Sequence, residues 1–216
     1  MSLGLKAAGS AKQAGVNLTT PRLRRSFFAR DPVILARDLL GRILFYRTTD
    51  GLLAGRIVET EAYTGAADPA SHAFRGRTAR NTVMFGPAGY AYVYFSYGMH
   101  YCLNVTAERR GTAGAVLLRA LEPLAGIDLM RAQGDHGPEP KLLSGPGKIG
   151  RAFGLGLRDN GRDFTRGPLG ISAGTAIPDG QVAVSRRVGI SRAVDFPYRF
   201  AVVGSRSVSG SVPSAR

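Results

Sequence analysis

Apolar and polar residues alternate along much of this chain with the two-residue period of a β-strand. Strand-like runs over residues 43–47 and 53–63 flank an Asp50-Gly51 turn, and this arrangement predicts a β-hairpin. Further strands are predicted over residues 90–96, 101–106 and 115–120, and within residues 182–203. A turn is predicted at residues 97–100, between the first two of these.

Helical spacing is confined to a few segments. Leu35, Leu39 and Leu40 recur at helical intervals behind Asp31-Pro32, a pair typical of a helix start, so a helix is predicted over residues 26–40 and ended by Gly41. Shorter helices are predicted over residues 125–132 and from residue 149 to 153. Strands and helices do not alternate regularly, which favours the α+β class over a parallel α/β sheet.

We therefore expect an α+β fold: a single domain with a curved, mostly antiparallel sheet flanked by helices and a protruding β-hairpin. The folded domain is predicted over residues 23–204, between a disordered basic tail (1–22) and a flexible tail (205–216). Residues 64–89 are rich in Gly, Pro, Ala and Arg and show little periodicity. A loop of that length inside a compact domain is usually functional.

Charge narrows the class of partner. The 216 residues include 29 Lys and Arg against 15 Asp and Glu, a net charge of +14. This excess predicts a polyanionic partner, with nucleic acid ahead of an anionic membrane surface. No apolar run reaches the length of about 20 residues that a membrane span needs. The single cysteine, Cys102, excludes an internal disulfide framework, and a cytoplasmic location is expected.

An acidic pair stands out in this basic chain. In the segment RIVETEAY, residues 56–63, strand alternation places Ile57, Glu59, Glu61 and Tyr63 on one face. A carboxylate there can take a proton from water or stabilise a nearby cation. The alternative is that both glutamates simply pair with surplus arginines, and Glu59 is assigned to that structural role.

The segment YAYVYFSYGMHY, residues 90–101, is rich in tyrosine. Tyr97 falls at the predicted turn, where it has little core to pack into. Flat aromatic side chains beside a basic surface can stack on nucleobases, and a wedge at a hairpin tip can enter a base step. The alternative is an aromatic core strand with one exposed tyrosine.

Other motifs carry weaker signals. The histidines, His72, His100 and His136, lack the spacing of metal ligands, so no metal site is predicted. The stretch SGPGK, residues 144–148, fails as a nucleotide-binding loop because Ile149 stands where Ser or Thr is required. Lys148 and the backbone beside it remain candidates for contacting a nucleic-acid phosphate. No pattern for nucleophilic Ser or Cys catalysis is present.

Several of these motifs occur together in one order: RIVETEAY, a loop with His72, YVYFSYGMHYCLNV, VLLRALEP and LLSGPGKIGRAFGL. In order and spacing the chain resembles the alkyladenine (3-methyladenine) DNA glycosylase family, from about residue 25 to about residue 203. The resemblance implies a monofunctional enzyme of base excision repair that flips a damaged purine, alkylated or deaminated, out of double-stranded DNA and hydrolyses its N-glycosidic bond.

The resemblance also implies roles for individual residues. Glu61 would be the general base that activates water, and Arg119 and the backbone carbonyl of Val188 would help to hold that water. The base pocket would comprise Tyr63, His72, Tyr94 and Asn104, and Tyr97 would be the intercalating residue. Apart from the resemblance, Lys148 and His100 are kept as candidates for phosphate contact. No metal and no cofactor is implied, and we expect a nucleoid-associated monomer with no membrane partner.

Two other functions remain open from the sequence. One is a nucleic-acid-binding protein without catalysis, for which an acid such as Glu61 in a basic groove has no use. The other is a glycosidase that acts on sugars through Glu59 and Glu61. A charge of +14 argues against the second, since neutral glycans gain nothing from it.

Overall fold

The computed structural model describes residues 20–96 and 98–211. Eight strands form one sheet, in which β3, β4, β5, β2, β1 and β6 lie side by side in that order, and β8 pairs with both β2 and β7. The strands are β1 (Ile43–Thr48), β2 (Gly51–Tyr63), β3 (Ala91–Ser96), β4 (His100–Thr106), β5 (Ala115–Ala125), β6 (Leu169–Ser172), β7 (Val182–Ser185) and β8 (Arg199–Val202). All pairs between these strands are antiparallel, which confirms the predicted α+β class.

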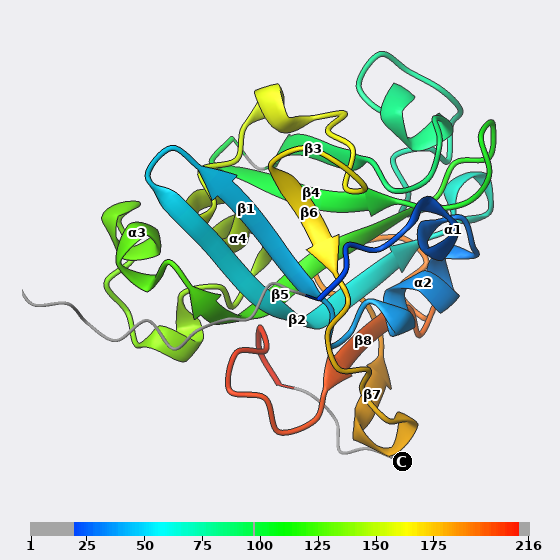
Figure 1. The fold of residues 1–216 in the computed structure, drawn as a ribbon. Helices are drawn as coiled ribbons and strands as arrows, with labels where there is room; N and C mark the ends of the chain where they lie inside the picture. Colours follow the sequence, from blue (N-terminus) through cyan, green and yellow to red (C-terminus); the bar gives the residue numbers. More distant parts are fainter. Residues whose placement is uncertain (1–19, 97, 212–216) are drawn as a thin grey trace, which may run out of the picture.

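The helices are short and lie around the sheet (Figure 1). They are α1 (Arg25–Phe28), α2 (Pro32–Asp38), α3 (Ile127–Ala132) and α4 (Pro146–Ala152), with 3-10 turns η1 (Gly65–Ala67), η2 (Thr82–Phe85), η3 (Glu139–Lys141), η4 (Leu157–Asp159) and η5 (Asp179–Gln181). The predicted loop over residues 64–89 is confirmed apart from η1 and η2. Leu35 of α2 and Ile149 of α4 are buried in the same core as Leu118 of β5, so both helices cover one face of the sheet.

Two predicted elements need correction. The helix expected over residues 26–40 is two helices, because the Asp31 carboxylate accepts hydrogen bonds from the amides of Val33 and Ile34 and Pro32 occupies the first turn. A capped start of this kind begins a new helix. Strand β6 was missed because its four residues are all buried, so no alternation of polar and apolar positions marks it.

A bulge in β2 changes which side chains share a face. Ile57 pairs with Leu121 of β5, and Glu59 pairs with the very next residue, Ala120, so β2 has one extra residue here. Ile57 consequently enters the main core, while Val58 and Glu59 lie on the opposite face. The prediction that Ile57 faces the same way as the two glutamates was wrong, and the shared face of Glu59, Glu61 and Tyr63 is retained.

Both predicted tail boundaries are corrected within the described residues. Arg22 bridges to Ser172 and its guanidinium donates to the carbonyls of Phe164 and Gly167, so residues 20–22 belong to the folded domain. Residues 205–211 are also packed on it, and Val208 is only 4% exposed. Residues 1–19 and 212–216 lie outside the described part, and the prediction of disorder there is not tested.

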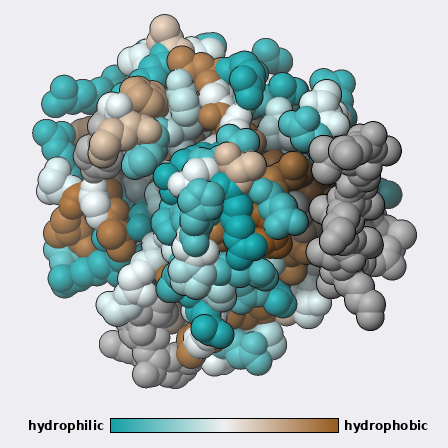
Figure 2. Space-filling model, turned by 90° about the vertical axis from the view of Figure 1, so that its left-hand side faces the viewer, coloured by the Kyte–Doolittle hydropathy of each residue, from teal (hydrophilic) through white to brown (hydrophobic). Residues whose placement is uncertain are grey.

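Within residues 20–96 and 98–211, no helix is long and apolar enough to cross a membrane. Figure 2 shows the face on the left-hand side of Figure 1, where hydrophilic residues predominate and hydrophobic ones occur in scattered patches. Scattered apolar residues of this kind are normal on a protein surface.

Candidate active site

Glu61 lies on β2 with no solvent-accessible surface, and its carboxylate is held by three groups. The amide of Val188 donates to Oε1 at 2.7 Å, and the hydroxyl of Tyr63 donates to Oε2 at 3.0 Å. Nη1 of Arg119, from β5, lies 3.3 Å from Oε1. The carboxylate is therefore fixed in position by a cation and two hydrogen-bond donors.

Burial dominates the electrostatics of this carboxylate. Desolvation raises the pKa of Glu61 above its ordinary range, and Arg119, the Val188 amide and the Tyr63 hydroxyl offset part of the rise. Desolvation alone would lower the pKa of Arg119, but Glu61 and Glu59 together raise it. A carboxylate whose pKa is raised by burial beside a fixed cation has two properties expected of a general base.

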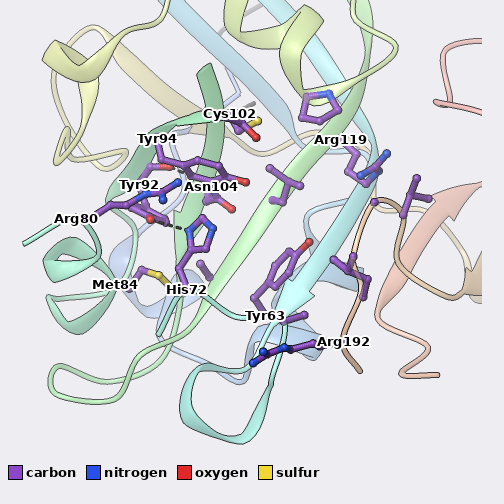
Figure 3. A pocket seen from close by; sticks show the side chains of 18 of the residues that line it. Tyr63, His72, Arg80, Met84, Tyr92, Tyr94, Cys102, Asn104, Arg119 and Arg192 are labelled. Atoms are coloured by element: carbon purple, nitrogen blue, oxygen red, sulfur yellow. Dashed lines mark hydrogen bonds between the residues drawn. The ribbon is translucent and has the colours of Figure 1, made fainter. Parts of the chain in front are cut away.

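A cavity of about 640 Å³ lies next to the groups that hold this carboxylate (Figure 3). The three groups that hold Glu61, namely Tyr63, Arg119 and Val188, all line it. The facing wall comes from the β3–β4 hairpin, and its labelled side chains are Tyr92, Tyr94, Cys102 and Asn104. A volume of this order is typical of small-molecule binding sites.

Aromatic rings dominate that facing wall. His72 meets Tyr94 edge to face at a centroid distance of 4.6 Å, and its Nδ1 is 2.9 Å from the hydroxyl of Tyr92. Burial and the nearby Arg80 lower the pKa of His72, which favours the neutral imidazole. Asn104 is buried, and its amide donates to the Tyr92 carbonyl at 3.1 Å. The wall is thus a rigid set of flat rings with a few fixed polar groups.

A buried ion pair supports the opposite wall. Arg187 donates to both carboxylate oxygens of Asp68, at 2.5 and 2.8 Å, and to the carbonyl of Ala62 at 2.9 Å. Its guanidinium also lies 4.7 Å from the ring centre of Tyr63. Asp68 precedes His72 in the long loop, so one arginine connects that loop, strand β2 and the segment that carries Val188.

Comparison with known proteins identifies the family to which this chain belongs. The model of the family described as "Methylpurine-DNA glycosylase (MPG)" matches residues 26–206. The chain belongs to this family. It is a DNA glycosylase that hydrolyses N-glycosyl bonds, and its task is DNA repair by base excision.

Curated relatives agree with the family over most of the chain. A protein of Carboxydothermus hydrogenoformans named "Putative 3-methyladenine DNA glycosylase" is 48% identical over 188 residues, which cover 87% of this chain and 98% of the relative. Proteins with the same name from Koribacter versatilis and Methanoculleus marisnigri are each 47% identical over 87% of this chain, covering 93% and 98% of the respective relative.

Most of the predicted site residues of this glycosylase meet at one cavity. The residues that line it include Tyr63, His72, Tyr94, Asn104, Arg119 and Val188. Glu61 is not a lining residue and lies behind three of them, in contact with Tyr63, Arg119 and Val188. The contact of Val188 with Glu61 is made by its amide, whereas the sequence prediction concerned its carbonyl. Tyr97 lies outside the described residues, although its neighbour Ser96 lines the cavity.

The two candidate phosphate contacts do not line this cavity. The ammonium of Lys148 is bound to the Asp135 carboxylate at 3.1 Å and to the carbonyl of Lys141 at 2.8 Å. His100 is exposed at the start of β4, and its ring packs against Gly147 of α4. Their contact with phosphate stays a prediction.

The structure places at the glycosylase site two residues, Arg80 and Arg187, that the sequence did not indicate. Arg80 lies 5.2 Å from the ring centre of Tyr94 at the cavity wall, and Arg187 stands behind Tyr63. In a chain with so many arginines, residue type gives no signal for either one. The Arg-rich loop after β2 was the only hint of Arg80.

The pairing of Glu59 separates the DNA glycosylase from a sugar glycosidase. Glu59 is buried and binds Nε of Arg119 at 3.0 Å and Nε of Arg199 at 2.7 Å, which confirms the structural role predicted for it. Because two arginines pair with it, Glu59 is a poor candidate for the second catalytic carboxylate that a sugar glycosidase requires. Among the described residues, no three His, Cys, Asp or Glu side chains form a metal-binding group.

Proposed function

We propose that this enzyme flips alkylated or deaminated purine nucleotides out of duplex DNA and hydrolyses the N-glycosidic bond with Glu61 as general base. The observation that carries the proposal is a fixed, buried carboxylate whose three partners line a cavity walled by aromatic rings. A base cannot be reached inside the stack, so chemistry at its glycosidic bond requires extrusion into such a pocket.

In the proposed reaction, the extruded base stands between Tyr63 on one side and His72 and Tyr94 on the other. Glu61 takes a proton from a water held beside it by Arg119 and the Val188 carbonyl. The water oxygen then bonds to C1′ while the bond from C1′ to the purine nitrogen breaks, and the bonding electrons leave with the base. The carboxylate also stabilises the positive charge that develops on the sugar.

The pocket residues would act mainly through stacking. An alkylated purine is cationic and is attracted to tyrosine faces, and its glycosidic bond is already weak. Asn104 would crowd the exocyclic amine of guanine and so disfavour undamaged guanine. Tyr97 would fill the gap that the extruded nucleotide leaves in the duplex. No lysine lines the described cavity, which fits an enzyme that releases the base without cutting the strand.

A single lesion in one duplex needs one active site, and all the proposed groups come from one chain. We therefore propose that a monomer acts on double-stranded DNA that contains the damaged purine.

The test of the proposed function is direct. The enzyme is incubated with duplexes that each carry one methylated purine, one hypoxanthine or one ethenoadenine, and abasic sites are scored after mild alkaline cleavage. Release from at least one of these duplexes and none from the undamaged duplex is the expected result. Absence of release from all of them would remove the proposed substrate class.

The pH dependence of excision should follow Glu61. Glu61 must be ionised to act as the general base, so the single-turnover rate should rise with pH through the pKa of Glu61 and then level off. Because burial raises the pKa of Glu61, the rise in rate should occur at a pH above the ordinary glutamate pKa of about 4.3. A duplex with a methylated purine is the suitable substrate, since its base is already cationic and needs no protonation to leave. A flat profile from pH 4 to 8 would contradict the assignment.

Duplex binding should weaken steeply with salt, because a net charge of +14 predicts that several phosphates are neutralised. For about five contacts, the dissociation constant should rise by about 4.5 orders of magnitude per tenfold increase in salt. Titration of a fluorescent duplex between 50 and 400 mM salt measures the slope. A neutral-lesion and an undamaged duplex should give similar slopes, since phosphate contacts do not depend on the base.

A further inference from the structure

Residues 205–211, here called the C-terminal strap, run behind the active site. Figure 1 shows this segment in red, next to β8 and close to β2 and β5. Val208 of the strap packs with Val58 of β2, Ala120 of β5 and Ala201 of β8 in a small buried cluster. The strap is therefore fixed against the three strands that carry the buried charges of the site.

Ser209 is the strap residue that reaches those charges. Its amide donates to Oε2 of Glu59 at 2.7 Å, and its hydroxyl donates to Oε1 at 3.0 Å. The same hydroxyl accepts a hydrogen bond from Nη2 of Arg119 at 3.2 Å. One serine thus links a buried carboxylate to the arginine that touches Glu61.

The guanidinium of Arg119 is planar, so its contacts on one edge determine where the other edge points. Nε is held by Glu59 and Nη2 by Ser209, while Nη1 is directed at Glu61. Loss of the Ser209 hydroxyl leaves Nη2 without this partner and lets the plane tilt about the Nε contact. The distance between Nη1 and Glu61 then varies.

The strap itself is anchored independently of Ser209's side chain. Arg199 of β8 donates to the carbonyl of Ser209 at 3.1 Å and to the carbonyl of Ser211 at 3.3 Å. Lys141 donates to the carbonyl of Val208 at 3.4 Å. These bonds involve the strap's backbone, so a change of the Ser209 side chain leaves the path of the strap intact.

We propose that Ser209 is a positioning residue for base excision, which holds Arg119 in place against Glu61 directly and through Glu59. This inference rests on the proposed function, because it takes Glu61 as the base and Arg119 as its partner.

The expected signature lies in the pH profile. The charged and titratable groups around Glu61 are Arg119 from β5, Arg187 from the segment before β8, Arg199 from β8, which pairs in register with Glu61, and Glu59 and Tyr63 from β2. Among them, Arg119 is the cation nearest the carboxylate and offsets the effect of burial. A loosened Arg119 offsets less of the effect of burial, so the pKa of Glu61 increases. The pH at which the excision rate rises therefore moves upward.

The experiment compares Ser209→Ala with Ser205→Ala. Ser205 belongs to the same strap and also donates to a carboxylate, that of Glu122, at 2.8 Å, but this contact lies away from the cavity. Single-turnover release from a methylated-purine duplex is measured across pH, with the melting temperature of each variant alongside. We expect Ser209→Ala to lower the plateau rate about tenfold, as for one hydrogen bond to a charged group, and to move the rise to higher pH.

Ser205→Ala should match the wild type in rate and in pH profile, and Ser209→Thr, which keeps the hydroxyl, should restore most of both. An unchanged Ser209→Ala profile would overturn the inference, as would a slower rate with an unmoved rise. The Glu61→Gln variant distinguishes failure of the proposed function from failure of the inference about Ser209. If that variant still releases the base, the proposed function fails and the inference with it. If it is inactive while Ser209→Ala is unaffected, the inference about Ser209 fails alone.

Discussion

Replacement of Glu61 by Gln should abolish base release while duplex binding stays close to that of the wild type. Glutamine has nearly the same shape and its carbonyl still accepts the hydrogen bond that the Val188 amide now donates at 2.7 Å. It cannot take a proton from water, and it carries no charge to stabilise the sugar in the transition state. Removal of a general base costs about 10²–10⁴-fold in rate, and loss of the charge adds to this.

The measurement is single-turnover release from a methylated-purine duplex, with binding followed by fluorescence anisotropy on the same duplex. Glu139→Gln is the control, since this exposed carboxylate lies on η3 and does not line the cavity. It changes the net charge by the same amount and should leave the rate unaltered. Excision by Glu61→Gln at the wild-type rate would rule out the proposed mechanism.

Replacement of Asp68 by Ala should destabilise the fold strongly. The side chains of Asp68 and Arg187 are both fully buried, so the variant leaves a guanidinium inside the protein without its carboxylate. Asp68 also accepts hydrogen bonds from the amides of Thr64 and Ala70, which lose their partner. Breaking a buried pair in this way costs about 3–5 kcal/mol. For a domain of this size that corresponds to a fall of about 6–20 °C in melting temperature.

Asp179→Ala is the matched control for stability. Asp179 also pairs with an arginine, Arg37, but its side chain is 95% exposed, and such a surface pair contributes at most about 1 kcal/mol. The double variant Asp68→Ala/Arg187→Met should recover part of the loss, since it removes the uncompensated charge. A melting temperature of Asp68→Ala within 2 °C of the wild type would show that the pair does not support the site.

Much of the fold could be predicted because its signals are local. The hairpin of β1 and β2 follows from alternation on either side of Asp50-Gly51, and the long loop follows from composition. The predicted faces of β2 were correct for Glu59, Glu61 and Tyr63 and failed at Ile57, because a bulge is decided by how β2 pairs with β5. No property of β2 taken alone specifies that pairing.

The strap was missed for a related reason. Residues 205–211 are short, rich in serine and without periodicity, so they are indistinguishable from a flexible tail in the sequence. In the fold, Ser209 supplies an amide and a hydroxyl to Glu59, a buried carboxylate that needs partners. The need arises only when β2, β5 and β8 come together.

By itself, the sequence determined the antiparallel α+β class and the basic character, since these depend on local patterns and residue type. The candidate base Glu61 and the pocket residues came from the resemblance of its motifs to a known family. Only the tertiary structure decided which charges meet. It separated Glu59, which pairs with Arg119 and Arg199, from Glu61, whose partners Tyr63 and Val188 line the cavity. It also placed Arg187 behind Tyr63 and Ser209 behind Arg119. Burial and contact between residues far apart in the chain create these roles, and neither is encoded in any short segment.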